Sequence, residues 1–113
     1  MKPGDVCLAL FPFGGAGGRK LRPVLLLTGR VGGVPEYVVA YISSAAPADA
    51  LPSDLWIDPA NPADGKTGLS VRSVVRLHKL STLHQRDLVR LMGAVSPLLL
   101  DEAKAKLRDL LFT

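Results

Sequence analysis

The residues best suited to chemistry are an arginine and a serine that one predicted hairpin brings together. The glycine pair at positions 32–33 is typical of a two-residue β-turn. With that turn, Arg22 lies opposite Ser43 and Val24 lies opposite Tyr41. Directly opposed residues of an antiparallel pair share one face, with Cβ atoms roughly 5 Å apart. The sequence therefore predicts that a guanidinium and a hydroxyl lie side by side.

Such a pair suits the cleavage of a phosphodiester. A guanidinium is permanently charged, and its planar fork binds phosphate oxygens and stabilises the charge of their transition state. A neighbouring hydroxyl can orient the scissile phosphate or the attacking group. RNA carries its own nucleophile, the 2′-hydroxyl, so that a metal ion is not required. The alternative is that Arg22 forms a surface ion pair and that Ser43 merely ends a strand.

Positive charge and aromatic rings elsewhere in the chain are compatible with a polyanion. Arg19 and Lys20 follow a glycine-rich loop, and the second half of the chain carries Arg72, Arg76, Lys79, Arg86 and Arg90. Such residues usually form solvated faces, and at best they guide RNA by charge. Three aromatic residues could stack on unpaired bases or be buried instead: Tyr37, Tyr41 and Trp56.

Several common kinds of active site are missing. There is no P-loop, no Rossmann glycine fingerprint and no His-Glu-x-x-His zinc motif. His78 and His84 are not expected to converge. Strand alternation puts His78 on the same side as Arg76 and Leu80, whereas His84 falls in a predicted turn. Cys7 lies in an apolar strand and is interpreted as inert core. As the single cysteine, it excludes an intramolecular disulfide and a thiolate zinc site.

Short strands fill most of the chain. Apolar or alternating runs predict strands over 6–11, 21–28, 36–43, 54–57, 68–71 and 73–80, with Pro12 ending the first. The runs 68–71 and 73–80 fit one strand with a bulge. Residues 88–95 suit a final strand or a short helix, and we favour the strand.

One helix is predicted at the C-terminal end. Ser96 is a suitable N-cap and Pro97 suits the first helical position. An apolar face is expected from residues at helical spacing, namely Leu100, Ala103, Leu107, Leu110 and Leu111. The order of elements predicts a mainly β (α+β) fold, a small barrel or strongly bent sheet with one helix packed on it.

Size and composition fit one globular domain over residues 1–113. Hydrophobic residues make up 48% and charged residues 21% of the chain, which are ordinary values for such a domain. No apolar stretch is long enough to span a bilayer, and the first residues make a poor signal peptide. With a single cysteine, these features predict a cytoplasmic protein without membrane contact. The net charge of +4 permits a polyanionic partner without requiring one.

The blocks of sequence resemble the MazF/PemK toxin family. Gly4-Asp5-Val6 opens a strand to Pro12, and a glycine-rich loop then leads into Arg22-Pro23-Val24-Leu25. The resemblance continues through the strand that ends at Ser43, through Gly68-Leu69-Ser70, and on to the terminal helix. The first two blocks are specific together at this spacing, and most of the chain is covered.

The resemblance implies a small SH3-like β-barrel that forms a homodimer and cuts single-stranded RNA. It implies that no metal or other cofactor takes part and that the products carry 2′,3′-cyclic phosphate and 5′-hydroxyl ends. A cognate antitoxin would block the RNA groove. The family's catalytic arginine falls on Arg22 and its Thr/Ser on Ser43, with Ser44 as an alternative hydroxyl. We expect RNA contacts from Arg19, Lys20, Tyr41, Arg76 and Lys79.

Two departures from the family pattern leave the cleavage sequence open. The loop before Arg22 is glycine-rich and basic where many members carry acidic or polar residues, and Ser81-Thr82-Leu83 replaces an Arg-Thr-Ile segment. The competing hypothesis is a non-catalytic protein on the same fold. It would be either a CcdB-like gyrase inhibitor or a homologue that binds RNA or antitoxin without cutting.

Overall fold

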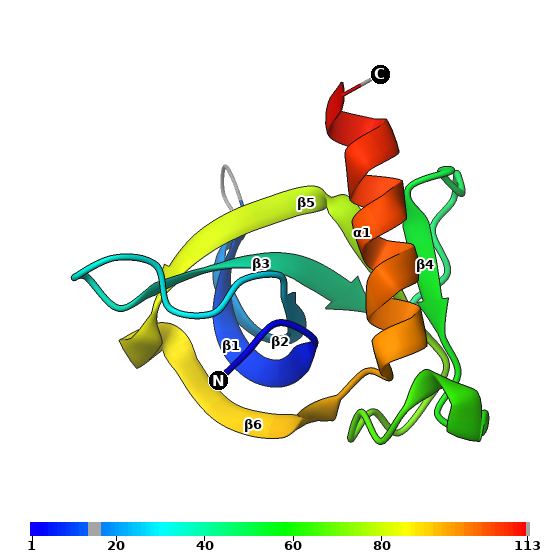
Figure 1. Cartoon of the computed structure of the whole chain (residues 1–113), viewed down its shortest axis with the longest axis horizontal. Helices are drawn as coiled ribbons and strands as arrows, with labels where there is room; N and C mark the ends of the chain where they lie inside the picture. Colours follow the sequence, from blue (N-terminus) through cyan, green and yellow to red (C-terminus); the bar gives the residue numbers. More distant parts are fainter. Residues whose placement is uncertain (14–16, 113) are drawn as a thin grey trace.

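The computed structural model describes residues 1–13 and 17–112 (Figure 1). Its elements, in chain order, are β1 (Asp5–Phe13), β2 (Gly18–Leu26), β3 (Glu36–Ser43), β4 (Asp54–Ile57), η2 (Pro62–Asp64), β5 (Ser73–His84), η3 (Gln85–Asp87), β6 (Leu88–Ala94) and α1 (Pro97–Phe112). The predicted strands over 36–43 and 54–57 are confirmed, and residues 88–94 form the strand that we favoured over a helix.

The six strands of the described residues form one curved antiparallel sheet in the order β4-β5-β3-β2-β1-β6 (Figure 1). The mainly β fold with a C-terminal helix is thus confirmed. The predicted barrel is not closed, because β4 and β6 do not pair in the part of the chain that the structure describes. The end of β6 and the residues after it bond instead to η2 and the segment that follows it, where Ala94 N donates to Lys66 O and Ser96 N to Asp64 O.

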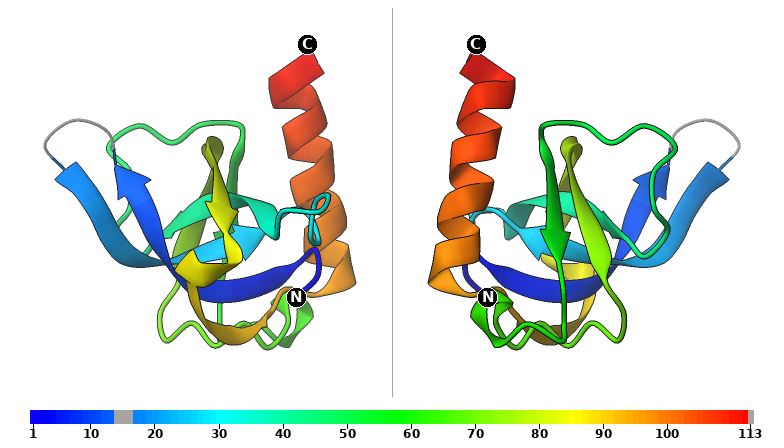
Figure 2. Two further views of the ribbon diagram at one scale, coloured as in Figure 1. Left: turned by 90° about the vertical axis from the view of Figure 1, so that its left-hand side faces the viewer. Right: turned by 90° about the vertical axis from the view of Figure 1, so that its right-hand side faces the viewer.

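The first hairpin is longer than predicted and runs through its proline. Pro12 pairs with Arg19 inside the β1–β2 ladder and does not end the strand. Alternation along β1 points the Pro12 nitrogen away from β2, and β1 has no β6 partner beyond Ala9. The missing N–H therefore costs no ladder bond. The far ends of β1 and β2 extend on the side of the molecule away from α1 (Figure 2).

The register of β2 on β3 is as predicted, although the turn is not. Val24 pairs with Tyr41 and Leu26 with Val39. The two-residue Gly-Gly turn was wrong, because Val31 bridges to Glu36 and residues 32–35 make the turn. The longer turn is offset by extra residues on the β2 side, where the Thr28 hydroxyl accepts from Val38 N at 3.1 Å. The longer turn and the extra residues on the β2 side compensate for each other, so the β2–β3 register is the predicted one.

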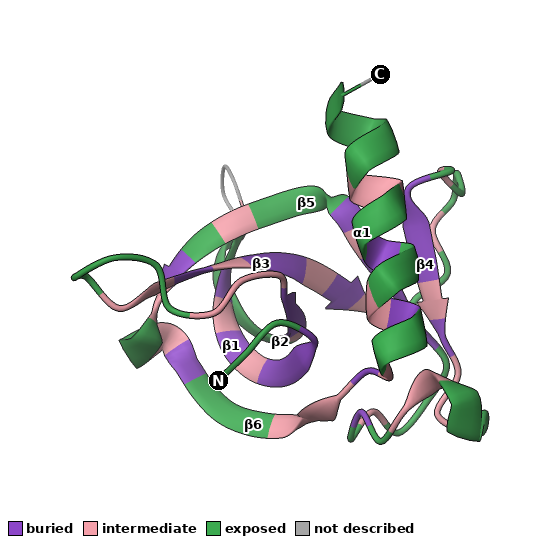
Figure 3. Ribbon diagram, in the orientation of Figure 1, coloured by how far each residue is buried: buried purple, intermediate pink, exposed green. Residues whose placement is uncertain are grey.

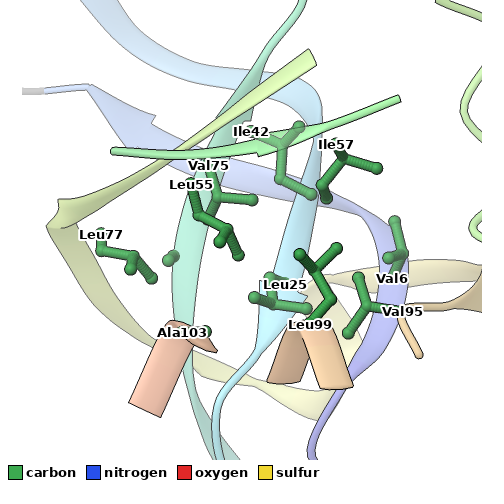
Figure 4. Close-up of a cluster of buried hydrophobic side chains, with 11 residues drawn as sticks. Val6, Leu25, Ile42, Leu55, Ile57, Val75, Leu77, Val95, Leu99 and Ala103 are labelled. Carbon is green, nitrogen blue, oxygen red and sulfur yellow. The ribbon is translucent and has the colours of Figure 1, made fainter. Parts of the chain in front are cut away.

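Two apolar clusters make up the core. The first lies between the sheet and α1 and contains Leu25, Ile42, Leu55, Leu77 and Leu99 among its buried residues (Figure 4). The second is formed by alternate residues of β1, β2 and β3 together with Leu83 and Leu88, and it includes Cys7 and Ala9. Buried positions concentrate in the middle of the sheet, while the outer end of α1 is exposed (Figure 3).

The helix begins as predicted, but its apolar face is only partly buried. The Ser96 hydroxyl accepts from Leu99 N at 3.2 Å, which satisfies one free amide of the first turn. Leu99 and Ala103 are buried, whereas Leu110 and Leu111, at the end of the predicted apolar face, are exposed. The last turns extend past the sheet (Figure 1). Among the described helices, none is long and apolar enough to cross a membrane.

Candidate active site

A pocket of about 400 Å³ lies where the middle of β2 and the end of β3 meet the segment before β5. It is lined by Arg22, Pro23, Tyr41, Ile42, Ser43, Ser44, Ala45, Gly68, Leu69, Ser70, Val71, Ser73 and Met92. All three residues predicted to be catalytic, Arg22, Ser43 and Ser44, are in this lining. The structure thus brings these three residues into the lining of one pocket.

Pro23 explains why the pocket opens there. The last β2–β3 pair is Val24–Tyr41. Leu27 N donates to Val38 O across this ladder, so alternation points the Pro23 nitrogen toward β3 as well. Proline has no N–H to donate, and the ladder ends. Arg22 and Ser43 lie just beyond this end, where the two strands are no longer joined.

The guanidinium of Arg22 is available to a ligand. Its side chain is exposed, and Nη1 donates to the Leu21 carbonyl oxygen at 2.8 Å. It forms no ion pair with a carboxylate in the described residues. The structure thus contains no ion pair of the kind that the alternative interpretation of Arg22 required. The charge remains free for an anion, which a guanidinium binds through two parallel N–H donors.

The two serines differ in how firmly they are held. The Ser43 hydroxyl accepts from Ala45 N at 3.2 Å and donates to Ala45 O at 3.3 Å, which fixes its place at the end of β3. Ser44 is exposed, lies in the bend after β3 and makes no side-chain hydrogen bond within the described residues. Ser43 is therefore the better-oriented hydroxyl.

The third wall of the pocket was missed by sequence reasoning. Residues 68–71 were predicted to form a strand, but they form a loop held against β6. A Cβ on Gly68 would lie 2.4 Å from Met92 O, and one on Gly93 would lie 2.2 Å from Lys66 O. Gly68 also has φ +78°, which favours glycine. Backbone in such close contact fixes Leu69 and Ser70 in the pocket wall, and only the Gly-Leu-Ser block hinted at it.

An aromatic cluster adjoins the pocket through Tyr41. The rings of Phe11, Phe13 and Tyr41 contact one another with centroids 5.2–5.4 Å apart. Lys20 Nζ lies 5.8 Å from the centre of the Phe13 ring, and Lys79 Nζ lies 5.7 Å from that of Tyr41. Three predicted RNA contacts, Lys20, Tyr41 and Lys79, thus lie together. Phe13 was not predicted, because nothing in the sequence distinguishes it from a core residue.

The two remaining predicted RNA contacts already have acidic partners. Arg19 forms an ion pair with Asp87 near the β1–β2 hairpin. Arg76 Nε lies 3.0 Å from Asp54 Oδ1, and the Arg76 side chain is only 12% exposed. The placement of Arg76 is that of an internal ion pair, which gives no support to the predicted RNA contact.

Other candidates lie outside the pocket. Arg72 stacks on Trp56 at 4.0 Å from the ring centre, and Tyr37 is buried. His84 accepts from Arg86 N, and His78 lines a different hollow beside α1.

Burial, and secondarily the charge of Asp5, raises the pKa of the Cys7 thiol. The described residues contain no group of three or more His, Cys, Asp or Glu that could hold a metal ion.

Fold and site together define a class of protein: a small, mainly β domain with a free arginine and serine hydroxyls in one pocket. The sequence profile of the PemK-like, MazF-like toxins of type II toxin–antitoxin systems matches residues 2–111. The chain belongs to this family. Comparison with curated proteins gave no match.

Solved structures with the same fold include family members. Toxin MazF-mt6 of Mycobacterium tuberculosis superposes with a TM-score of 0.70 at 22% identity, covering 93% of both chains. MazF of Deinococcus radiodurans gives 0.68 at 20% identity, covering 99% of this chain and 96% of its own. A mycobacterial endoribonuclease in complex with its cognate antitoxin gives 0.66 at 19% identity, covering 96% and 92%. At these identities the likeness shows the fold.

Proposed function

We propose that this chain is the toxin of a type II toxin–antitoxin system and a sequence-specific endoribonuclease that cuts single-stranded mRNA without a metal. The observation that supports the proposal is the pocket itself, whose lining contains Ser43, Ser44 and Arg22, an arginine with no ion pair within the described residues. Family membership and the structural neighbour described as an endoribonuclease support it.

The chemistry follows from these groups. The 2′-oxygen of the substrate attacks the adjacent phosphorus, the P–O5′ bond breaks, and the 2′-hydroxyl loses its proton while the 5′-oxygen gains one. A 2′,3′-cyclic phosphate and a 5′-hydroxyl result. Arg22 stabilises the charge that gathers on the phosphoryl oxygens. Ser43, held by its turn, orients the scissile phosphate, with Ser44 as the second candidate.

The donor set of the pocket supports a reaction that proceeds without a metal. Its lining contains arginine, serine, tyrosine and apolar residues, but no carboxylate, histidine or cysteine. Hard cations such as Mg²⁺ prefer carboxylate oxygens, and zinc sites use histidine or thiolate. The substrate's own 2′-hydroxyl supplies the nucleophile.

Partners and location complete the proposal. We place the toxin in the cytoplasm as a homodimer that a cognate antitoxin inhibits, since one structural neighbour is described as an endoribonuclease in complex with its cognate antitoxin. Light scattering of the purified chain tests the dimer. Inhibition by the product of a neighbouring small acidic reading frame tests the antitoxin.

The decisive test is cleavage of single-stranded RNA by the purified chain in EDTA, with the new ends mapped by sequencing of 5′-hydroxyl termini. The proposal expects cuts at one short sequence. RNA binding without any cleavage would instead indicate an inactive homologue. Inhibition of DNA supercoiling by gyrase would indicate the CcdB-like alternative.

A further inference from the structure

We propose that Phe13 and Lys79 form a base-binding subsite beside the cleavage pocket, and that this subsite selects a keto base, uracil or guanine. The inference rests on the proposed function, because it assigns one part of the same RNA site. It goes further in naming the chemical feature of the base that is recognised.

The subsite is a hollow of about 300 Å³, separate from the cleavage pocket and from the hollow beside α1. It is lined by Phe11, Pro12, Phe13, Lys79, Leu80 and Ser81. Phe13 is partly exposed and Leu80 is exposed, so apolar surface is presented to solvent. Stacking of a base on an aromatic ring is favourable for every base, since each has a π-face.

The hollow adjoins the cleavage pocket through one pair of rings. Tyr41 lines the cleavage pocket and Phe13 lines the second hollow, and their rings meet edge to face with centroids 5.2 Å apart. A single RNA strand can thus place its scissile phosphate beside Arg22 and a neighbouring base against Phe13. The base preference would be expressed close to the cut.

Lys79 owes its position to an irregularity in the sheet. Ala40 pairs with Leu80, but the next residue, Tyr41, pairs with Arg76, so residues 77–79 are extra on β5. This bulge places Lys79 Nζ 5.7 Å from the centre of the Tyr41 ring. Bulges commonly redirect a side chain toward a functional site.

The polar groups of the hollow favour an acceptor on the base. The Lys79 ammonium can only donate hydrogen bonds, and the other polar side chain, Ser81, is a hydroxyl. No carboxylate lines the hollow to accept from an exocyclic amine. The O4 atom of uracil or the O6 atom of guanine can accept from Lys79, whereas the amino group of cytosine or adenine would face a cation.

The test is the binding of two uncleavable oligonucleotides to the full chain. Oligo(U) and oligo(C) of equal length, 2′-O-methylated throughout, lack the nucleophile. Their bases differ at position 4, which is keto in uracil and amino in cytosine, and at N3, which carries a hydrogen in uracil only. Fluorescence polarisation should show oligo(U) bound about five- to tenfold more tightly than oligo(C). Lys79→Met should remove this preference, and Phe13→Leu should weaken both ligands about tenfold.

Lys104→Met is the matched control, because Lys104 is an exposed lysine on α1 outside both pockets. It should keep the preference for oligo(U). Equal binding of both ligands by the unmodified chain, failure to bind either, or a preference that survives in Lys79→Met would overturn the subsite. RNA cleavage with equal binding would leave the proposed function standing. If the chain cuts no RNA but prefers oligo(U) in a way that depends on Lys79, the subsite stands and the proposed function is wrong.

Discussion

Arg22 and Ser43 line one pocket although the ladder between their strands ends before it reaches them. The last paired residues are Val24 and Tyr41, and Pro23 has no N–H to extend the ladder toward β3. The same hairpin that brings the two side chains together therefore leaves space between them. A paired register would have filled this space with backbone hydrogen bonds.

The two serines should contribute unequally to cleavage. Ser43→Ala should lower kcat about a hundredfold, because the turn that holds this hydroxyl directs it to the shared face with Tyr41. Ser44→Ala should cost less than about fivefold, because this exposed side chain lies in the bend after β3 and no hydrogen bond within the described residues orients it. Single-turnover cleavage of a defined RNA measures both. The opposite ranking would make Ser44 the working hydroxyl.

Close backbone contact at Gly93 should make this position intolerant of a side chain. Gly93→Ala places a Cβ about 2.2 Å from Lys66 O, and the strain should destabilise the protein by about 2 kcal/mol. Gly33→Ala is the control, since nothing lies within 4 Å of its added Cβ. Urea denaturation measures both. Equal stability of the two variants would show that the loop of residues 65–70 is not held as described.

Arg76 should act on stability and not on RNA binding. Its partner Asp54 is buried, so Arg76→Met leaves an uncompensated carboxylate and should cost about 3 kcal/mol. Adding Asp54→Asn should restore part of the loss. Arg86→Met, at an exposed arginine, should change little. A weaker salt dependence of RNA binding in Arg76→Met, without loss of stability, would instead support the contact predicted from sequence.

Cys7 should be unreactive in the folded protein. Burial raises the pKa of its thiol, so at pH 8 it forms less thiolate than a free cysteine does, and alkylation should be slow until urea unfolds the chain. Because the pKa is higher in the folded than in the unfolded state, the contribution of the protonated thiol to folding stability is fully present below the unfolded pKa. It is lost as the pH rises through the folded pKa. Equal alkylation rates in buffer and in urea would contradict this placement.

The sequence was most informative where a pattern is local. The Ser96–Pro97 start of α1 and the strands over 36–43 and 54–57 follow from caps and alternation within a few residues. The β2–β3 register was also predicted, but for an incomplete reason, because the turn and the extra residues near Thr28 offset each other.

The features that escaped prediction depend on contacts between distant segments. The wall formed by Gly68 requires β6 behind it, and the position of Lys79 requires a bulge opposite Tyr41. From the sequence Arg76 was expected to be a solvated cation, but in the structure it forms an internal ion pair. Its partner, Asp54, comes from a neighbouring strand. None of these pairings leaves a periodic signal in the sequence.

The most direct test of the account is RNA cleavage in EDTA by Arg22→Ala, compared with the unmodified chain and with Arg108→Ala at an exposed position of α1. Circular dichroism should show that all three are folded. The loss of one charge-stabilising donor group predicts a fall of about a thousandfold in cleavage by Arg22→Ala, and no change in Arg108→Ala. Cleavage by Arg22→Ala at the unmodified rate and at the same sites would contradict the central role assigned to this arginine.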